Sequence, residues 1–196
     1  FFWPGPPHFR EEVQETASRD ASVRSRANPL EAERCAELAE ALAARAGARS
    51  VAVLSWYNAQ VSALRERLRP RPRCAGLHCG SVVTAQGSEW DYVLLSTVRA
   101  EAPAERGRPQ LGCLADRHLL NVAVTRGRLG IVVLGDPALL RTNRHWEAFL
   151  RHCAEVGGLL DASEKPEVLA AGVRSSAAFG AGRTGPSELG GPDALR

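Results

Sequence analysis

The segment 116–135 combines an apolar stripe at helical spacing with an unbroken aliphatic run. Apolar residues recur there at the spacing of one helical face, as Leu119, Leu120, Ala123 and Val124. Asp116 precedes this face as a candidate N-cap, and Gly127 and Gly130 interrupt it. The aliphatic run 131–134 that follows is typical of a strand covered on both faces. The pattern therefore predicts a helix, a break and a buried strand.

Short apolar runs and helical stripes alternate along the rest of the chain as well. They predict strands at 51–55, 77–84 and 92–98, and helices at 29–46, between 58 and 70, and at 146–153. Asn28 is expected to cap the first of these helices, with Pro29 at its first position and Glu31 closing a capping box. Asn58 is expected to cap the second. Strands that alternate with helices predict an α/β fold with a mostly parallel sheet flanked by helices.

The periodic pattern covers only the middle of the chain. We expect residues 1–27 to be a linker from a preceding segment, residues 28–156 to form one α/β lobe, and residues 157–196 to be a largely disordered tail rich in Gly, Ala and Ser. The chain contains no methionine. We therefore expect it to be part of a longer protein, whose preceding half could carry part of the chemistry.

Charge adds a second feature, because nearly all the cations are arginine. The formal net charge is +3, and Lys165 is the sole lysine. Guanidinium groups bind phosphate well, but a GC-rich gene would also favour arginine codons. We attribute the overall arginine content to the gene, and consider phosphate binding only for particular arginines. Arginine alternates with other residues from Arg65 to Arg73. A solvated helix end is favoured there over a strip that follows a nucleic-acid backbone.

Several classes of site are not supported by the sequence. It contains no Gly-rich phosphate loop, no acidic strand end that would bind Mg²⁺, and no nucleophile elbow. No apolar run approaches the roughly 20 residues of a membrane span. Cys74, His78 and Cys79 could begin a zinc site, but no second pair of ligands follows at metal spacing. An odd number of cysteines, five, favours free thiols in a reducing compartment.

The polar residues of this pattern suggest one site. Ligands of parallel sheets bind at the carboxyl ends of the strands, so the polar clusters after Leu54, Val83 and Val98 are expected at one edge. Arg126 and Arg128 stand between the helical stripe and the buried strand. They are either solvated charges or guanidinium groups aimed at a phosphate, and Arg126 is the stronger candidate.

Three stretches resemble the motifs of superfamily 1 helicases. Residues 54–60 (LSWYNAQ) resemble motif IV, residues 86–96 (QGSEWDYVLLS) with Val98 and Arg99 resemble motif V, and residues 120–128 (LNVAVTRGR) resemble motif VI. Their order and spacing are similar to the C-terminal RecA-like lobe of the Upf1-like branch. Within that branch the chain is most similar to the helicase-with-zinc-finger proteins, which include a nuclear-receptor coactivator.

The resemblance implies an ATP site between two RecA-like lobes, of which this chain supplies the second. The phosphate loop and the Mg²⁺ ligands would belong to the first lobe. Arg126 matches the arginine that reaches the γ-phosphate, and Glu89 matches the acid that contacts the ribose. The other nucleotide-binding candidates are Gln86 and Gly87, in the turn before Glu89, and Arg128. The hydroxyls of Ser55 and Thr84 would face the nucleic-acid backbone.

The implied partners are single-stranded RNA or DNA, the first lobe of the same protein, and transcription or RNA-processing proteins, in the nucleus or the cytoplasm. The motifs also depart from the family pattern, at Val83, Ala85, His118 and Leu119. The family often has an aspartate and an aromatic residue at the first two positions, and paired arginines at the last two. These departures leave a second interpretation, a catalytically degenerate scaffold of the transcriptional coactivator type.

Overall fold

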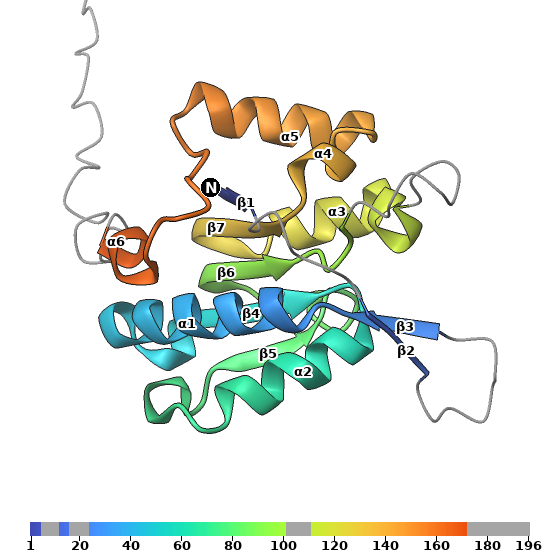
Figure 1. Ribbon diagram of the computed structural model, residues 1–196. Coiled ribbons are helices and arrows are strands. Elements are labelled where there is room, and N and C mark those ends of the chain that lie inside the picture. Colours follow the sequence, from blue (N-terminus) through green and yellow to red (C-terminus); the bar gives the residue numbers. More distant parts are fainter. Residues whose placement is uncertain (5–11, 16–23, 101–110, 172–196) are drawn as a thin grey trace, which may run out of the picture.

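A five-stranded sheet forms the centre of the molecule, for which the computed structural model describes residues 1–4, 12–15, 24–100 and 111–171. From one edge to the other the strands are β1 (Phe2–Pro4), β7 (Gly127–Gly135), β6 (Trp90–Ser96), β4 (Val51–Ser55) and β5 (His78–Ser81) (Figure 1). Every pairing in this sheet is parallel. A separate antiparallel hairpin joins β2 (Glu12–Glu15) to β3 (Arg24–Ala27). The predicted α/β fold with a mostly parallel sheet is confirmed.

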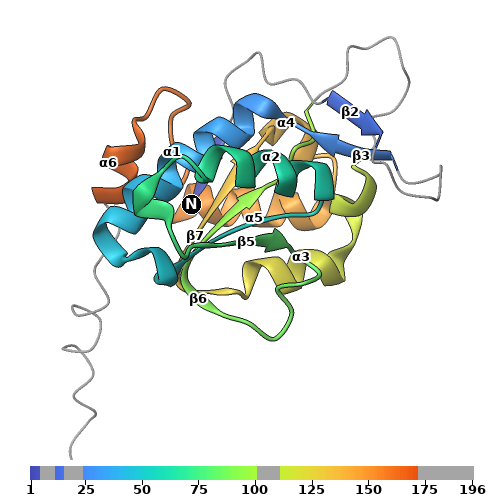
Figure 2. The ribbon, with the colours of Figure 1, turned by 90° about the horizontal axis from the view of Figure 1, so that it is seen from below.

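Helices cover both faces of the sheet, as Figure 2 shows. One face carries α1 (Pro29–Ala46), α2 (Asn58–Leu68) and α6 (Pro166–Ala171). The other face carries α3 (Arg117–Val124), α4 (Pro137–Leu140) and α5 (Arg144–Glu155). Single 3-10 turns stand at η1 (Ala48–Ser50), η2 (Pro72–Cys74) and η4 (Gly112–Ala115).

The central strands are apolar throughout because they pack against helices on both sides. In β4, Val51 and Val53 join the core under α1 and α2, whereas Ala52 and Leu54 join the core under α3 and α5. All four side chains are fully buried. An unbroken aliphatic run is what such a two-sided strand requires.

The sheet extends beyond the range in which the sequence predicted the lobe. Phe2 and Trp3 were expected in a linker, but they are buried and pair in parallel with β7. The Trp3 indole nitrogen donates to the carbonyl of Asp161 at 3.0 Å, and the Arg34 guanidinium lies 4.6 Å from the Trp3 ring centre. Residues 157–171, expected in a disordered tail, thus help to cover β1. The rest of the expected linker and tail, at 5–11, 16–23 and 172–196, lies outside the described residues.

Helix caps follow the sequence at some sites and not at others. Asn28 caps α1 by accepting from the backbone N–H of Glu31 at 3.1 Å, and Asp116 caps α3 by accepting from His118 at 2.7 Å. Asn58 does not cap α2; instead the Ser25 hydroxyl accepts from the Ala59 N–H at 2.9 Å. A residue from the β2–β3 hairpin therefore replaces the local cap.

Two strand boundaries also differ from the prediction. The strand predicted at 77–84 ends at Ser81, because Ala85 N–H donates back to the Ser81 carbonyl at 3.1 Å and turns the chain. The strand predicted at 92–98 begins earlier, at Trp90, and ends at Ser96. The short β5 and the early start of β6 leave an exposed turn between them.

Candidate functional site

The turn between β5 and β6 is exposed from Val83 to Glu89 except at Ala85, which is buried. Backbone bonds from Ala85 to Ser81 and from Ser88 to Ala85 close it. Gly87 has φ +83°, a conformation that strains any L side chain, and a Cβ built there would meet nothing within 4 Å. Gly87 is therefore needed for the shape of the turn.

Arg126 is attached to this turn by its backbone and its side chain. It stands between α3 and β7, where its carbonyl accepts from the Trp90 N–H at 3.0 Å. Its Nη1 donates to the Ser88 carbonyl at 3.0 Å, and its Nε donates to the Val122 carbonyl at 2.9 Å. The structure thus brings Arg126 next to the turn that carries Gln86, Gly87 and Glu89, as the motifs predicted.

The Arg126 guanidinium makes hydrogen bonds within its own lobe and also has N–H groups that no residue in the described part of the chain binds. Its bond to Val122 and its Nη2 bond to the Thr125 hydroxyl, at 2.9 Å, place positive charge at the carboxyl end of α3, where it is favourable. Together with the bond to Ser88, these contacts use three of the five guanidinium N–H groups. Two N–H groups remain for a ligand on the half-exposed side of the residue.

Arg128 lies beyond Arg126, at the start of β7. Its Nε and Nη2 donate to Asp91 Oδ1 at 3.1 and 2.7 Å, and its side chain is 58% exposed. This ion pair compensates the charge of Arg128. The Glu89 and Gln86 side chains are exposed on the turn itself.

The predicted site residues do not share one edge of the sheet. Glu89, Arg126 and Arg128 stand at the amino ends of β6 and β7, whereas Ser55 stands at the carboxyl end of β4. The carboxyl ends of β4, β5 and β6 lie at one edge of the parallel sheet, as predicted, but Glu89 and the two arginines lie at the opposite edge, so the prediction of one site at the carboxyl edge is wrong. The turn carries the chain directly from the carboxyl end of β5 to the amino end of β6.

Thr84 begins the turn and is exposed. Its Oγ1 donates to the Ser81 carbonyl at 3.0 Å and lies 3.2 Å from the position of a Cβ on Gly80. On the same face His78 stacks on Trp90, with 4.6 Å between ring centres. Burial lowers the pKa of His78 and so disfavours its charged form. Thr84 and Arg126 therefore lie at the two ends of one partly aromatic surface.

Ser55 is placed differently from its prediction. Its side chain is fully buried, its hydroxyl donates to the Ser96 carbonyl at 3.0 Å, and it accepts from the Tyr57 N–H. A hydroxyl in this position cannot face a nucleic-acid backbone. It fixes the turn from β4 into α2 instead.

A buried polar network around Glu31 was missed by the sequence reasoning. Glu31 does not close a capping box; its Oε1 accepts from the Ser96 hydroxyl at 2.6 Å and from the Val98 N–H at 2.9 Å. Burial raises the pKa of the Glu31 carboxyl to about 7, although these hydrogen bonds lower it in part. Its Oε2 has no partner among the described residues. The capping-box spacing was the only feature of the sequence that indicated a role for Glu31, and it predicted a bond within the first turn of α1 instead of bonds to Ser96 and Val98.

The network holds an unusual backbone at Val98. This buried β-branched residue has φ +69°, and Arg99 N–H donates to the Thr97 carbonyl across it at 2.7 Å. Such a turn is strained and persists only where its surroundings fix it. Glu31 binds the N–H of Val98 and the Asn28 amide donates to its carbonyl at 3.2 Å. The end of β6 is thereby tied to the start of α1.

Neither metal ligands nor a membrane helix were found in the described part of the chain. Across 1–4, 12–15, 24–100 and 111–171, no group of three or more His, Cys, Asp or Glu side chains is arranged to hold a metal ion. The helices described there are too short or too polar to cross a membrane.

The family described as AAA domain matches residues 6–138. Human 3'-5' exoribonuclease HELZ2 is 40% identical over 122 residues, which are 58% of this chain and 4% of that protein. The putative helicase MOV-10 of Gallus gallus is 35% identical over 118 residues, 56% of this chain and 12% of that protein. The ATP-dependent helicase upf1 of Schizosaccharomyces pombe is 38% identical over 81 residues, 41% of this chain and 8% of that protein. The chain therefore spans a small part of the length of each relative.

Proposed function

Because this chain belongs to the AAA domain family, in the Upf1-like branch of superfamily 1 helicases, we propose that its five-stranded sheet and flanking helices act as the C-terminal RecA-like lobe of an ATP-dependent helicase. The observation that carries this proposal is the attachment of Arg126 to the exposed turn of Glu89. ATP would bind between this surface and a first lobe. The closer placement beside the helicase-with-zinc-finger proteins stays a prediction.

The two ends of the nucleotide would meet different residues. Glu89, exposed at the end of the turn, would accept from the ribose hydroxyls, and the backbone of Gln86 and Gly87 would border the sugar. Arg126 would use its two unoccupied N–H groups on the γ-phosphate. Arg128 contributes less in this proposal, because Asp91 already holds it.

Arg126 would act mainly in the transition state. Negative charge spreads over the transferred phosphoryl group, and a guanidinium fixed beforehand stabilises it without reorganising. Arginine residues in this role are worth about 10³ to 10⁵ in rate in other nucleotide hydrolases. Mg²⁺ would neutralise phosphate charge from the first lobe, since the described residues of this chain offer no cluster of ligands for it.

Single-stranded nucleic acid would cross the surface near Thr84. The exposed Thr84 hydroxyl can donate to a phosphate oxygen, whereas the buried Ser55 would act by positioning the β4–α2 turn. Contacts of this kind read the backbone, so binding should tolerate sequence changes and weaken with salt. RNA-processing or transcription proteins remain proposed partners of the whole protein.

The proposal is tested by ATP hydrolysis with and without a first lobe. The isolated 196-residue chain should show no turnover above background, because it holds Arg126 but no phosphate loop. A longer protein that joins it to a first lobe with an intact phosphate loop should hydrolyse ATP, faster with single-stranded RNA. Turnover by the pure chain that is abolished in Arg126→Ala would contradict the division into two half-sites. Failure of the two-lobe protein to bind nucleotide would favour the scaffold interpretation.

A further inference from the structure

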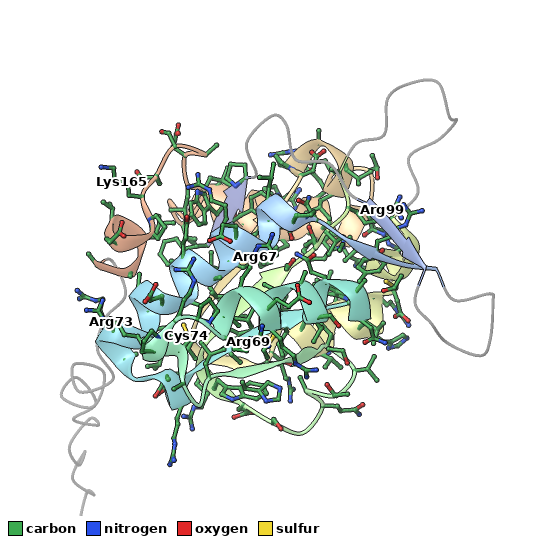
Figure 3. All side chains as sticks on the ribbon, turned by 60° about the horizontal axis from the view of Figure 1, so that its bottom comes forward. Arg67, Arg69, Arg73, Cys74, Arg99 and Lys165 are labelled. Carbon is green, nitrogen blue, oxygen red and sulfur yellow. The ribbon has the colours of Figure 1, made fainter. Side chains whose placement is uncertain are left out.

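A basic cavity of about 300 Å³ opens at the end of α2, beside the edge strand β5. Its rim includes Arg65, Arg69 and Arg71, and Leu68 and Leu77 belong to its apolar lining. In Figure 3, Arg69, Cys74 and Arg73 follow one another toward one side of the molecule, and Arg99 lies on the opposite side. The proposed ATP surface does not use this cavity.

The arginines between 65 and 73 divide into two groups. Arg67 and Arg71 form ion pairs with α1: Arg67 Nε lies 3.0 Å from Glu33, and Arg71 lies 2.6 Å from Glu33 and 2.7 Å from Glu40. Two positive charges thus meet two negative charges. This group joins α2 to α1 and leaves little charge for a ligand.

The charges of the second group are not compensated by acidic side chains in the described part of the chain. Arg65, Arg69 and Arg73 make no ion pair within the part of the chain that the structure describes, and neither does the neighbouring acid Glu66. Arg65 donates from Nε and Nη2 to the Cys79 carbonyl, at 3.3 and 2.9 Å. This fixes its guanidinium at the rim with three N–H groups unused. Arg69, four residues later, projects from the same side of α2.

The cavity and Thr84 adjoin the same stretch of edge strand. Arg65 binds the carbonyl of Cys79 from the α2 side. Gly80 follows Cys79 in β5, and a Cβ added to Gly80 would lie 3.2 Å from Thr84 Oγ1. Thr84 belongs to the turn on the opposite face of the sheet. A chain lying on Thr84 therefore has a direct path across the edge of β5 to Arg65.

We infer that this cavity binds a nucleotide unit of the same single strand, with Arg65 and Arg69 on its phosphate and Leu68 and Leu77 beside its base. The inference rests on the proposed nucleic-acid function, which it extends around the edge of the sheet. Guanidinium forks match phosphate oxygens, and the apolar lining suits the flat face of a base. An acidic peptide would match the arginines but would leave the apolar lining without a complementary group.

Binding of labelled oligouridine of about twelve nucleotides to the 196-residue chain tests this inference, by fluorescence anisotropy over a salt series. The double variant Arg65→Gln/Arg69→Gln should bind about tenfold more weakly, and the slope of log K against log salt should fall by about 0.7, the contribution of the one phosphate that both arginines contact. Arg69→Gln alone keeps the Arg65–Cys79 bond and should lose about half of that slope. The control Arg144→Gln/Arg151→Gln removes the same charge from α5, on the other face, and should leave affinity within about twofold.

The outcomes separate this inference from the function on which it rests. If the unaltered chain binds oligouridine and the Arg65/Arg69 variant binds it with the same affinity and slope, the cavity assignment is wrong and the proposed function stands. No binding by the unaltered chain at low salt would overturn both. Binding of a polyglutamate peptide that is lost in the same variant, while oligouridine binding is retained, would assign the cavity to acidic protein and contradict the inference. Circular dichroism melts confirm that the variants are folded.

Discussion

Glu31 and Arg126 differ in burial and in how fully their hydrogen-bonding groups are used. Glu31 is fully buried, with one carboxyl oxygen bound by Ser96 and Val98 and the other without a partner in the described chain. Arg126 is half-exposed, and its own lobe uses only part of its hydrogen-bonding capacity. Burial makes the first residue sensitive to pH, and exposure makes the second available to a ligand.

Replacing Glu31 should change how stability depends on pH. Its folded-state pKa is raised from 4.5 to about 7, so between these values the native protein holds a proton that the unfolded chain has lost. The free energy of unfolding should therefore fall as pH rises through this window, by about 3 kcal/mol, and then level off. Glu31→Gln cannot ionise, so its stability relative to the unaltered protein should rise by that amount. Urea unfolding at a series of pH values measures the difference.

The matched control for Glu31 is Glu66→Gln, which removes an exposed carboxyl from α2. Its stability difference from the unaltered protein should stay constant over the same pH range. A constant difference for Glu31→Gln as well would show that the buried carboxyl does not titrate in this window.

Glu89 should affect the binding of ATP more than its hydrolysis. A ribose contact is made equally in the bound nucleotide and in the transition state, so its loss is a loss of uniform binding. In a protein that joins this chain to a first lobe, Glu89→Gln should raise the KM for ATP with little change in kcat. Glu155→Gln, an exposed acid on α5, should change neither. An unchanged KM together with a large fall in kcat would contradict the ribose assignment.

At the scale of helices and strands, local signals were predicted well and distant partners were not. The cap at Asn28, the cap at Asp116 and the limits of the first buried strand follow from neighbouring residues. The strand at Phe2 has three residues and pairs with β7, about 130 residues later, so no periodicity could indicate it. The same reason explains the Ser25 cap of α2, where a hydroxyl from another element replaces the expected Asn58.

The candidate site shows the same division. The motifs indicated that Arg126 and the turn of Glu89 lie together, and the structure brings them together. They could not indicate that Ser55 is buried, because a serine at the end of a strand can face either solvent or the next strand. Glu31 was expected to bond locally, yet its partners lie 65 and 67 residues away.

The start of α1 should depend on Asn28 more than an ordinary helix depends on its cap. Its side chain caps the helix and also donates to the strained Val98, and its backbone N–H donates to the buried Gln60 amide. Asn28→Ala should cost about 2 to 4 kcal/mol of unfolding free energy, since it removes a cap and leaves a buried carbonyl unpaired. Asn143→Ala removes a partly buried cap from α5 alone and should cost about 1 kcal/mol. Equal losses in chemical denaturation would contradict a special role for Asn28.

At the scale of the whole molecule, the two proposed binding surfaces lie on opposite sides of the sheet. The turn of Glu89 and Arg126 is exposed at the amino ends of β6 and β7, on the α3 side. The cavity of Arg65 lies on the α2 side of β5, and Thr84 stands near the edge that joins the two. The proposed lobe would thus meet ATP and the first lobe on one surface, and carry nucleic acid around the edge of the sheet.

The most direct measurement is steady-state ATP hydrolysis by a protein that joins this chain to its first lobe. It compares the Arg126→Ala variant with the control variant Arg144→Ala on α5. Nucleotide binding and thermal melts are measured for the same variants. Arg126→Ala should fold and bind nucleotide but lose turnover by about 10³ to 10⁵, and Arg126→Lys should stay badly impaired because it lacks the planar fork. Arg144→Ala should hydrolyse ATP normally. Normal turnover in Arg126→Ala, with a lower melting temperature, would show that Arg126 only caps α3 and would contradict the proposed lobe.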